Sequence, residues 1–197
     1  MPGDFLRSAP KVTLDQFGAF RDSRPPEEKW ELIDGVPMMM PPPTIVHQII
    51  ARNLVRHLTD VLEIKNPAWL ATHEVGVQLP GGVLYHPEPD VVVMDADVRA
   101  GQRYADTFYL VAEVLSDSDS PEPIAAKVAF YKSHPSNACV LLIGQESAGV
   151  EIHERGEDGT WSQRRIARPD DMLSIAALGQ VCTLGQLYRG TPVFRLT

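Results

Sequence analysis

Three charged residues lie in or beside apolar segments, where charges are disfavoured. Asp90 directly precedes an apolar run of valines, Glu113 lies inside a second apolar run, and Lys127 interrupts a third that has helical spacing. Burying one unpaired charge costs several kcal/mol, so three such charges near one core indicate that they pair with one another or bind a metal ion. We therefore treat them as a candidate site.

The chemistry of this set depends on whether the first two segments are neighbouring strands. Both are short, rich in β-branched residues and bounded by turn formers, which is typical of β-strands. If they pair, Asp90 and Glu113 converge, and a divalent cation would relieve their repulsion. Oxygen ligands suit Mg²⁺ or Mn²⁺ better than Zn²⁺, and such an ion activates water and neutralises charge on a phosphate. Lys127 would position that water or stabilise the transition state, and Glu31 is a candidate for completing the ligand shell.

Each of these residues also has a purely structural explanation. Asp90 follows a proline and fits a turn. Glu113 fits a sheet edge where an Arg or Lys pairs with it, and Lys127 fits a side chain whose stem packs while its ammonium reaches water. Lys132 lies near the same apolar arc, so helical periodicity does not choose between the two lysines. The set gains specificity because the three charges follow the order strand, strand, helix.

Length and composition predict a single domain spanning residues 1–197. The hydrophobic fraction is 44% and the charged fraction 22%, which fits an ordinary globular chain and argues against disorder. No run approaches the ~20 apolar residues of a membrane span, and the N-terminus lacks a signal-peptide core, so we expect a cytoplasmic protein without a membrane partner. Cys139 and Cys182 have no metal-binding spacing, which favours free, buried thiols.

The charge balance limits how the chain can contact nucleic acid. Its net charge of −8 argues against tight nonspecific binding, which depends on clustered Lys and Arg. We expect weak or guided contact if the substrate is a polyanion. The positive groups available for such contact are Arg52, Arg56, Lys127, Lys132, Arg164 and Arg165.

The order of apolar runs and turn formers predicts an α/β fold, with a mixed sheet flanked by helices. Asp34-Gly35 favours a tight hairpin turn because both central positions need positive φ. Thr44 is a suitable N-cap for a long amphipathic helix, and a crossover helix lies between the two most apolar strands. The predicted elements are helices at 13–21, 44–63, 122–133 and 183–188, a hairpin at 30–40, strands at 69–79, 91–94, 108–115, 138–143, 150–153 and 160–166, and a polar loop at 95–106.

His47 and Arg52, both on the long helix, are candidate substrate-binding residues. His47 lies in the first turn, where a side chain can reach a cleft at the end of a sheet, and Arg52 lies on the polar face. A histidine beside an apolar stripe is more often a satisfied core residue, which is the favoured explanation for His57. An alternative metal site would use His47, His73 and His86, but these lack a short fixed spacing such as HxxxH.

Together these motifs resemble the Uma family of bacterial endonucleases in the PD-(D/E)XK restriction-endonuclease-like superfamily. The likeness covers residues 30–143 and comprises Glu31-Leu-Ile-Asp-Gly35, Pro41-Pro-Pro-Thr-Ile-Val-His47, Pro89-Asp90, Glu113-Val-Leu-Ser116, and Lys127 followed by Tyr131. It implies a restriction-endonuclease-like α/β core with a mixed sheet between helices. It also implies that Asp90 and Glu113 are the metal-binding acids, that the Val114 carbonyl is a further ligand, and that Glu31 is the acid from the N-terminal element.

One departure from the superfamily pattern concerns the lysine. It usually stands two residues after the second acid, where this chain has Leu115. The Uma-like pattern also shows a migrated lysine on the following helix, which corresponds to Lys127 here. Its ammonium can reach the same point from a helix packed beside the strand.

Two functions remain open on these grounds. The first is a Mg²⁺- or Mn²⁺-dependent endonuclease that hydrolyses phosphodiester bonds in DNA, alone or as a homodimer. The alternative is a non-catalytic nuclease-fold protein that acts as a protein-binding or assembly module, which the net charge of −8 suits. The first function requires Asp90 and Glu113 to meet closely enough to share one divalent ion.

Overall fold

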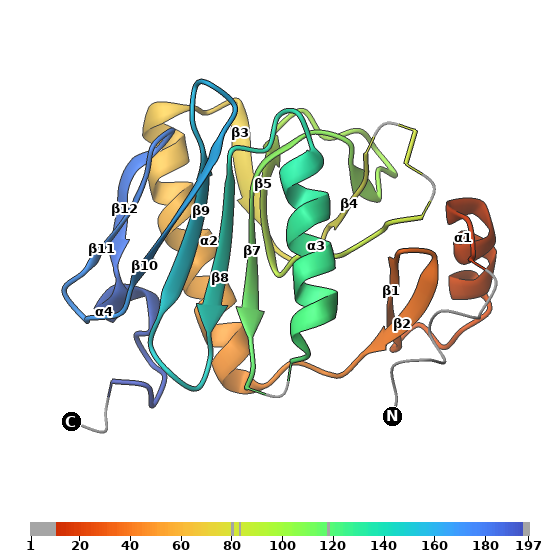
Figure 1. Ribbon diagram of the computed structural model, residues 1–197, viewed down its shortest axis with the longest axis horizontal. Helices are drawn as coiled ribbons and strands as arrows, with labels where there is room; N and C mark the ends of the chain where they lie inside the picture. The colour runs from red at the N-terminus through yellow and green to blue at the C-terminus, as the bar shows by residue number, and fades with distance from the viewer. Residues whose placement is uncertain (1–10, 80, 83, 118, 195–197) are drawn as a thin grey trace.

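A six-stranded mixed sheet forms the centre of the computed structural model, which describes residues 11–79, 81–82, 84–117 and 119–194 (Figure 1). The strand order is β10-β9-β8-β7-β5-β3. Within this sheet β7 and β8 pair in parallel and the other neighbours are antiparallel. The strands are β3 Trp69–Thr72, β5 Val91–Asp95, β7 Phe108–Leu115, β8 Cys139–Gly144, β9 Val150–Arg155 and β10 Trp161–Ile166.

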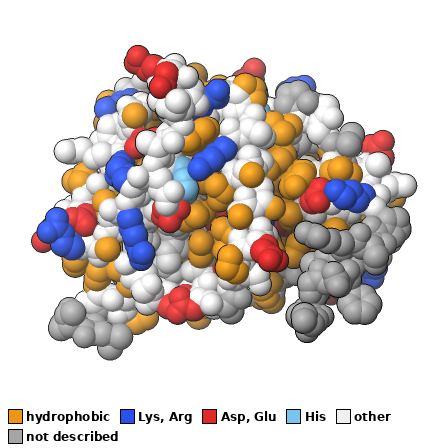
Figure 2. Space-filling model, viewed as in Figure 1, with side chains coloured by type: hydrophobic (Ala, Val, Ile, Leu, Met, Phe, Trp, Pro, Cys, Tyr) orange, Lys and Arg blue, Asp and Glu red, His pale blue; other side chains and the backbone are white. Residues whose placement is uncertain are grey.

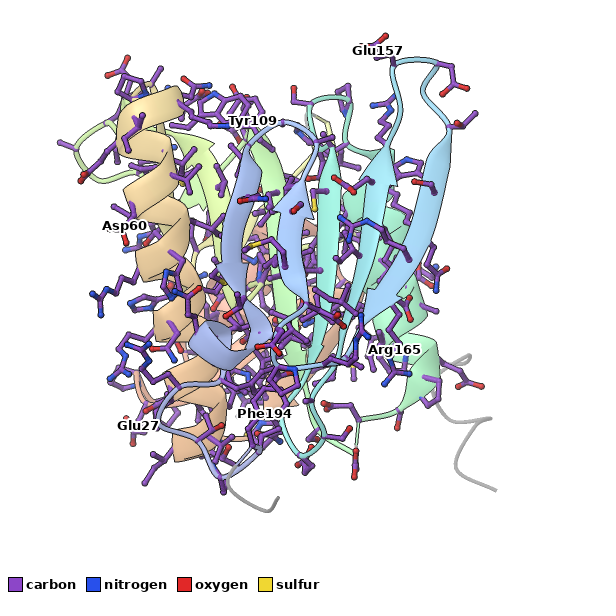
Figure 3. All side chains as sticks on the ribbon, turned by 90° about the vertical axis from the view of Figure 1, so that its left-hand side faces the viewer. Glu27, Asp60, Tyr109, Glu157, Arg165 and Phe194 are labelled. Atoms are coloured by element: carbon purple, nitrogen blue, oxygen red, sulfur yellow. The ribbon has the colours of Figure 1, made fainter. Side chains whose placement is uncertain are left out.

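Helices α2 (Ile45–Lys65) and α3 (Pro121–Ser133) cover opposite faces of this sheet (Figures 1 and 3). Helix α2 begins where predicted, because the Thr44 side chain accepts a hydrogen bond from the third backbone N–H of the helix. Helix α3 is the crossover that parallel neighbours such as β7 and β8 require. The predicted α/β architecture, a mixed sheet flanked by helices, is confirmed.

The N-terminal hairpin forms at the predicted turn. Strands β1 (Lys29–Ile33) and β2 (Val36–Met40) are antiparallel, and Asp34 and Gly35 between them have φ of 48° and 74°. These are the positive values that a two-residue hairpin turn of this hand needs. Helix α1 (Leu14–Asp22), capped by the predicted Thr13, packs beside the hairpin.

The outer edge of β2 contains a proline. The Leu32 N–H and C=O bond to the backbone of His86, so they point away from β2. Pro37 is the cross-strand partner of Leu32, so its nitrogen also points away from the hairpin ladder. The missing N–H of Pro37 therefore costs the hairpin no hydrogen bond.

Two segments on the far side of β5 differ from the prediction. The strand expected at 69–79 is interrupted after β3, because Glu74 adopts a left-handed conformation with φ of 56°. The chain then forms β4 (Gly76–Val77), which pairs in parallel with β6 (Tyr104–Ala105). Part of the segment expected to be a loop at 95–106 is thus a short strand, and that expectation is corrected.

The C-terminal part contains a hairpin that the sequence reading did not predict. Strands β11 (Met172–Ile175) and β12 (Gly179–Thr183) pack with α4 (Leu184–Leu187) on the α2 side of the sheet. The predicted turn between β9 and β10 is present, with Glu157 at its tip (Figure 3). Helix α4 forms within the helix predicted at 183–188, with Thr183 as its N-cap.

Regular alternation along the strand predicted at 108–115 would place Tyr109 on the same face as Glu113, but the structure places it on the opposite face. The pairing of β5 with β7 shifts register between Val93 and Met94, which leaves Tyr109 as an extra residue in β7. The Tyr109 ring stacks on Trp69 with ring centroids 3.8 Å apart, and both rings pack against the core on the α2 side. The bulge thus reverses the alternation of side chains at the start of β7.

Two smaller predictions can also be compared with the structure. Cys139 and Cys182 are buried and free, as expected. Among the helices of the described segments, none combines the length and the apolar character needed to cross a bilayer.

Candidate active site

The two predicted acids lie at one end of the central strands, where β7 ends and where β5, α2 and α3 begin (Figure 1). Val91, the first residue of β5, pairs with Ala112 of the antiparallel strand β7. Asp90 precedes Val91 and Glu113 follows Ala112, so the two acids lie opposite each other at this end of the strands. The Asp90 Oδ2 accepts a hydrogen bond of 2.7 Å from the Val114 N–H. The side chain of Asp90 thus extends the ladder by one bond beyond the end of the β5 backbone.

Lys127 reaches this end of the strands from α3 and lies between two carboxylates. Its Nζ is 2.8 Å from Glu31 Oε2 and 3.2 Å from Glu113 Oε1. Glu31 is 1%, Glu113 6% and Lys127 8% exposed. The alternatives of a lysine that reaches water and of a glutamate at a sheet edge are therefore wrong, since β7 is an inner strand. Lys132 points elsewhere, with its Nζ 2.8 Å from the His153 Nδ1.

Glu31 is held in place by the chain segment that leads into Asp90. Its Oε1 accepts a hydrogen bond of 3.0 Å from the Glu88 N–H, two residues before Asp90. Its strand neighbour Leu32 exchanges two backbone hydrogen bonds with His86. The N-terminal hairpin is therefore joined to the Asp90 segment by main-chain bonds, which fixes Glu31 relative to the sheet.

Tyr131 is a member of this cluster whose role the sequence reading did not predict. Its hydroxyl donates a hydrogen bond of 2.5 Å to Glu113 Oε1, and its side chain is fully buried. Tyr131 lies one helical turn after Lys127 on α3, so both residues face the sheet. This i, i+4 spacing on an inward helix face was the signal available in the sequence.

The pKa values of both Glu113 and Lys127 are raised, but for different reasons. Burial raises the pKa of Glu113, and the charges of Asp90 and Glu31 add to that rise, while Lys127 opposes it. Burial alone would lower the pKa of Lys127, but the carboxylates of Glu113 and Glu31 outweigh it and the pKa is raised. The ammonium of Lys127 is thus held charged at neutral pH.

His47 lies beside Asp90, as its position in the first turn of α2 suggested. Its Nε2 is 3.0 Å from Asp90 Oδ2. Burial lowers the pKa of His47, but the hydrogen bond and the charge of Asp90 outweigh this and raise it. The first turn is fixed by Thr44, which caps α2 and donates a hydrogen bond of 2.7 Å to the buried Gln145 at the end of β8.

The oxygen atoms at this end of the strands are suitable ligands for a hard divalent cation. Asp90 and Glu113 use one oxygen each for the hydrogen bonds above, and no described residue bonds to Asp90 Oδ1 or Glu113 Oε2. In a strand the N–H and C=O of one residue point to the same side, so the Val114 carbonyl faces the Asp90 side with its N–H. Two carboxylates, one carbonyl and water make the kind of oxygen shell that Mg²⁺ or Mn²⁺ accepts.

The alternative histidine site is not assembled. Within the described segments, no group of three or more His, Cys, Asp and Glu side chains is placed to hold a metal ion, so neither the three histidines nor Asp90, Glu113 and Glu31 together form such a group. His86 instead lies in the core, with its ring 4.2 Å from that of Tyr104 and 5.8 Å from that of Phe17. His73 is exposed and His47 is hydrogen-bonded to Asp90, so the three rings have separate environments and do not form one site.

A cleft of about 350 Å³ opens beside Asp90 and is the space into which a substrate can enter. Arg52 lines this cleft together with His47, which was expected to reach a cleft, and substrate binding by both residues stays a prediction. Gln48 and Glu74 line it too and were not predicted, because only the fold brings the end of β3 against α2. The lining residues are Pro43, His47, Gln48, Ala51, Arg52, His73, Glu74 and Asp90.

Comparison with known proteins identifies the family of this chain. The sequence profile of the Uma2 family, described as "Putative restriction endonuclease", matches residues 14–185. The chain belongs to the Uma2 family. The Uma2-family match includes every residue of the candidate site, from Glu31 to Tyr131.

A solved structure shows that this Uma2-family fold occurs elsewhere. The chain is similar to a protein from Anabaena variabilis whose crystal structure is described as "a putative nuclease belonging to DUF820". The TM-score is 0.69 at 18% sequence identity, and the alignment covers 90% of this chain and 97% of the other. The search of curated proteins found no significant match. The likeness supports a nuclease-like fold for this chain.

Proposed function

We propose that this Uma2-family chain is a Mg²⁺- or Mn²⁺-dependent endonuclease that hydrolyses phosphodiester bonds in DNA. The observation that carries the proposal is the convergence of the Asp90 and Glu113 carboxylates at one end of the central strands, beside the charged ammonium of Lys127. A divalent cation bound there would offset the repulsion between the two carboxylates. The nuclease-like fold and the family description support the same reaction class.

Each residue has a defined part in this proposal. Asp90, Glu113 and the Val114 carbonyl would hold the ion, which when bound supplies an activated water and neutralises charge on the phosphate. Lys127 orients the attacking water and stabilises the negative charge that builds on the phosphate oxygens. Glu31 keeps Lys127 charged and in place.

Two residues of the cleft would position the substrate. His47 holds the Asp90 carboxylate in its orientation through the 3.0 Å contact. Arg52 lines the cleft beside Asp90, where its guanidinium can contact the substrate strand. A homodimer stays a prediction that sedimentation would test.

The reaction is tested by incubating supercoiled plasmid, single-stranded DNA and RNA with the protein and Mg²⁺ or Mn²⁺. We expect metal-dependent cleavage of DNA that falls by roughly 10³-fold in Asp90→Asn and in Glu113→Gln. Glu63→Gln, which changes an exposed acid at the far end of α2, is the matched control and should cleave like the wild type. A folded wild-type protein that cleaves no nucleic acid with either metal would overturn the proposal.

Metal binding provides a readout that does not depend on cleavage. Calorimetric titration with Mn²⁺ should detect binding to the wild type and to Glu63→Gln, and weaker or no binding to Asp90→Asn. Absence of binding in the wild type would favour the alternative of a non-catalytic assembly module. Binding without cleavage would place the fault in the substrate tested or in the catalytic step.

A further inference from the structure

The cleft beside Asp90 is small for a nucleic-acid duplex. Its volume of about 350 Å³ lies at the lower end of the roughly 300–1,000 Å³ found for small-molecule pockets. Its walls are the first turns of α2 on one side and the His73-Glu74 segment on the other. A cavity of this size matches one nucleotide unit and not a pair of strands.

The walls of the cleft carry the groups that recognise a nucleobase. Gln48 and Arg52 are one helical turn apart on α2, so their side chains leave the same face of the helix. Arginine and glutamine bond to the edge of guanine and adenine respectively, and in both cases N7 of the purine is one acceptor. Pro43 and Ala51 add apolar surface on which a base can rest.

The opposite wall is shaped by an unusual backbone conformation. Glu74 is not a glycine, yet its φ is 56°, a conformation that non-glycine residues adopt uncommonly and that occurs at ligand sites. This conformation ends β3 and brings Glu74 to the cleft, where Lys29 lies 4.0 Å from its carboxylate. A carboxylate there can accept hydrogen bonds from base N–H groups.

The charge distribution also disfavours a duplex substrate. Of the side chains that line the cleft, Arg52 alone is a lysine or arginine. Figure 2 shows the α3 face of the sheet and not the α2 wall of the cleft, and on that face Lys and Arg side chains are interspersed with Asp and Glu side chains. Duplex affinity depends on neutralising many phosphates, which a chain with a net charge of −8 is poorly equipped to do. Recognition of a base inside a pocket needs far fewer cations.

We infer that the cleft binds one unpaired purine nucleotide of the substrate strand, with Gln48 and Arg52 on its base. The protein then acts on single-stranded or locally unpaired nucleic acid, with the scissile phosphate next to Asp90. This inference rests on the proposed function for its assignment of the cleft to the substrate strand. Its test is a binding measurement, so that it is judged separately from cleavage.

The test compares fluorescein-labelled ten-nucleotide single strands with the matched duplex by fluorescence anisotropy, with Ca²⁺ in place of Mg²⁺ and intact probe verified on a gel. DNA and RNA single strands are both measured, which distinguishes the two sources of the same base chemistry. We expect a single strand to bind at least tenfold more tightly than the duplex. Unlabelled GMP and AMP should compete better than CMP and UMP.

Variants on one helix provide the matched control. Arg52→Ala and Gln48→Ala should each weaken single-strand binding by about tenfold, the effect of losing one base contact. Arg56→Ala removes the same charge from the same exposed face one turn further along, outside the cleft, and should change binding less than twofold. Equal losses in Arg52→Ala and Arg56→Ala would mean general electrostatic attraction and would overturn the inference.

Other outcomes are equally decisive. Duplex binding as tight as single-strand binding, competition without preference for purines, or no binding of any probe would each overturn the purine pocket. Binding as expected without any cleavage would leave the pocket standing and count against the proposed nuclease reaction. Cleavage of plasmid together with unchanged single-strand binding in Gln48→Ala and Arg52→Ala would support the proposed nuclease reaction and overturn the purine pocket.

Discussion

Each face of the central sheet buries an apolar cluster, and the α3 face also buries a charged one. On the α2 face, Leu54, Leu58 and Leu141 belong to one apolar cluster and are fully buried. On the α3 face, Glu113 and Lys127 of the candidate active site are buried with charges that need each other. Successive side chains of a strand point to opposite faces of the sheet. The comparison therefore shows that β7 can supply core side chains on one face and position reactive groups on the other.

The largest effect on stability is expected from Lys127→Met on the α3 face. It would leave Glu31 and Glu113 buried without a cation, which costs about 3–5 kcal/mol of unfolding free energy. Urea unfolding followed by circular dichroism measures this loss. Lys132→Met, on the same helix but paired with His153, should lose far less. Equal losses in the two variants would mean that the charged cluster has no special weight.

A truncation on the α2 face should separate stability from metal binding. Leu58→Ala removes a fully buried side chain and should cost about 2–5 kcal/mol. Calorimetric affinity for Mn²⁺ at a temperature where the variant is folded should stay within twofold of the wild type, because Leu58 does not contact the site. A large fall in affinity would show that the two faces are coupled and would break the comparison.

Acid should lower the free energy of unfolding through protonation of His86, which contacts the N-terminal hairpin near the site. Burial lowers the pKa of His86 from 6.5 to about 4, so the unfolded chain binds a proton between these values that the folded chain does not. Stability is therefore complete above pH 6.5 and falls by about 1.4 kcal/mol per pH unit below it, or about 2 kcal/mol at pH 5. Urea unfolding at several pH values tests this, and His86→Phe, which does not titrate, should show a shallower pH slope. Identical slopes would contradict the assignment.

The smallest effect is expected at the turn that presents Glu31. Gly35→Ala places a Cβ on a residue with φ of 74°, 2.8 Å from the Lys11 Cβ, and should cost about 1–2 kcal/mol. Gly18→Ala is the matched control, because Gly18 lies within α1 with open space around it and should gain up to about 1 kcal/mol. Thermal unfolding of both variants measures the difference, and a stable Gly35→Ala protein would argue against a fixed hairpin.

Much of the fold could be predicted because it follows from local chemistry. The Asp34-Gly35 turn needs positive φ at two positions, and Thr44 caps the helix that follows it. Helical periodicity left Lys127 and Lys132 as alternatives, and the resemblance to the Uma family selected Lys127, whose Nζ lies beside Glu31 and Glu113 in the structure. Their roles in metal binding and catalysis remain predictions.

Other features depended on tertiary structure and could not be predicted. The bulge at Tyr109 arises from the pairing of β5 with β7, and the break at Glu74 arises where β4 leaves the main sheet to pair with β6. The sequence placed Gln48 on the polar face of a helix but did not indicate that it lines a cleft. The hairpin of β11 and β12 was missed although its residues alternate in burial, because the segments are short.

The proline in β2 limits how this molecule can meet its neighbours. Along the outward edge of that strand, Pro37 offers no N–H, and Pro41 follows with the same parity just past the strand end. A foreign strand laid against this edge would find a single donor, at Met39, between two blocked positions. The exposed Met39 of the hairpin therefore lies on an edge that offers an incoming strand few hydrogen-bond donors, which disfavours edge-to-edge aggregation there.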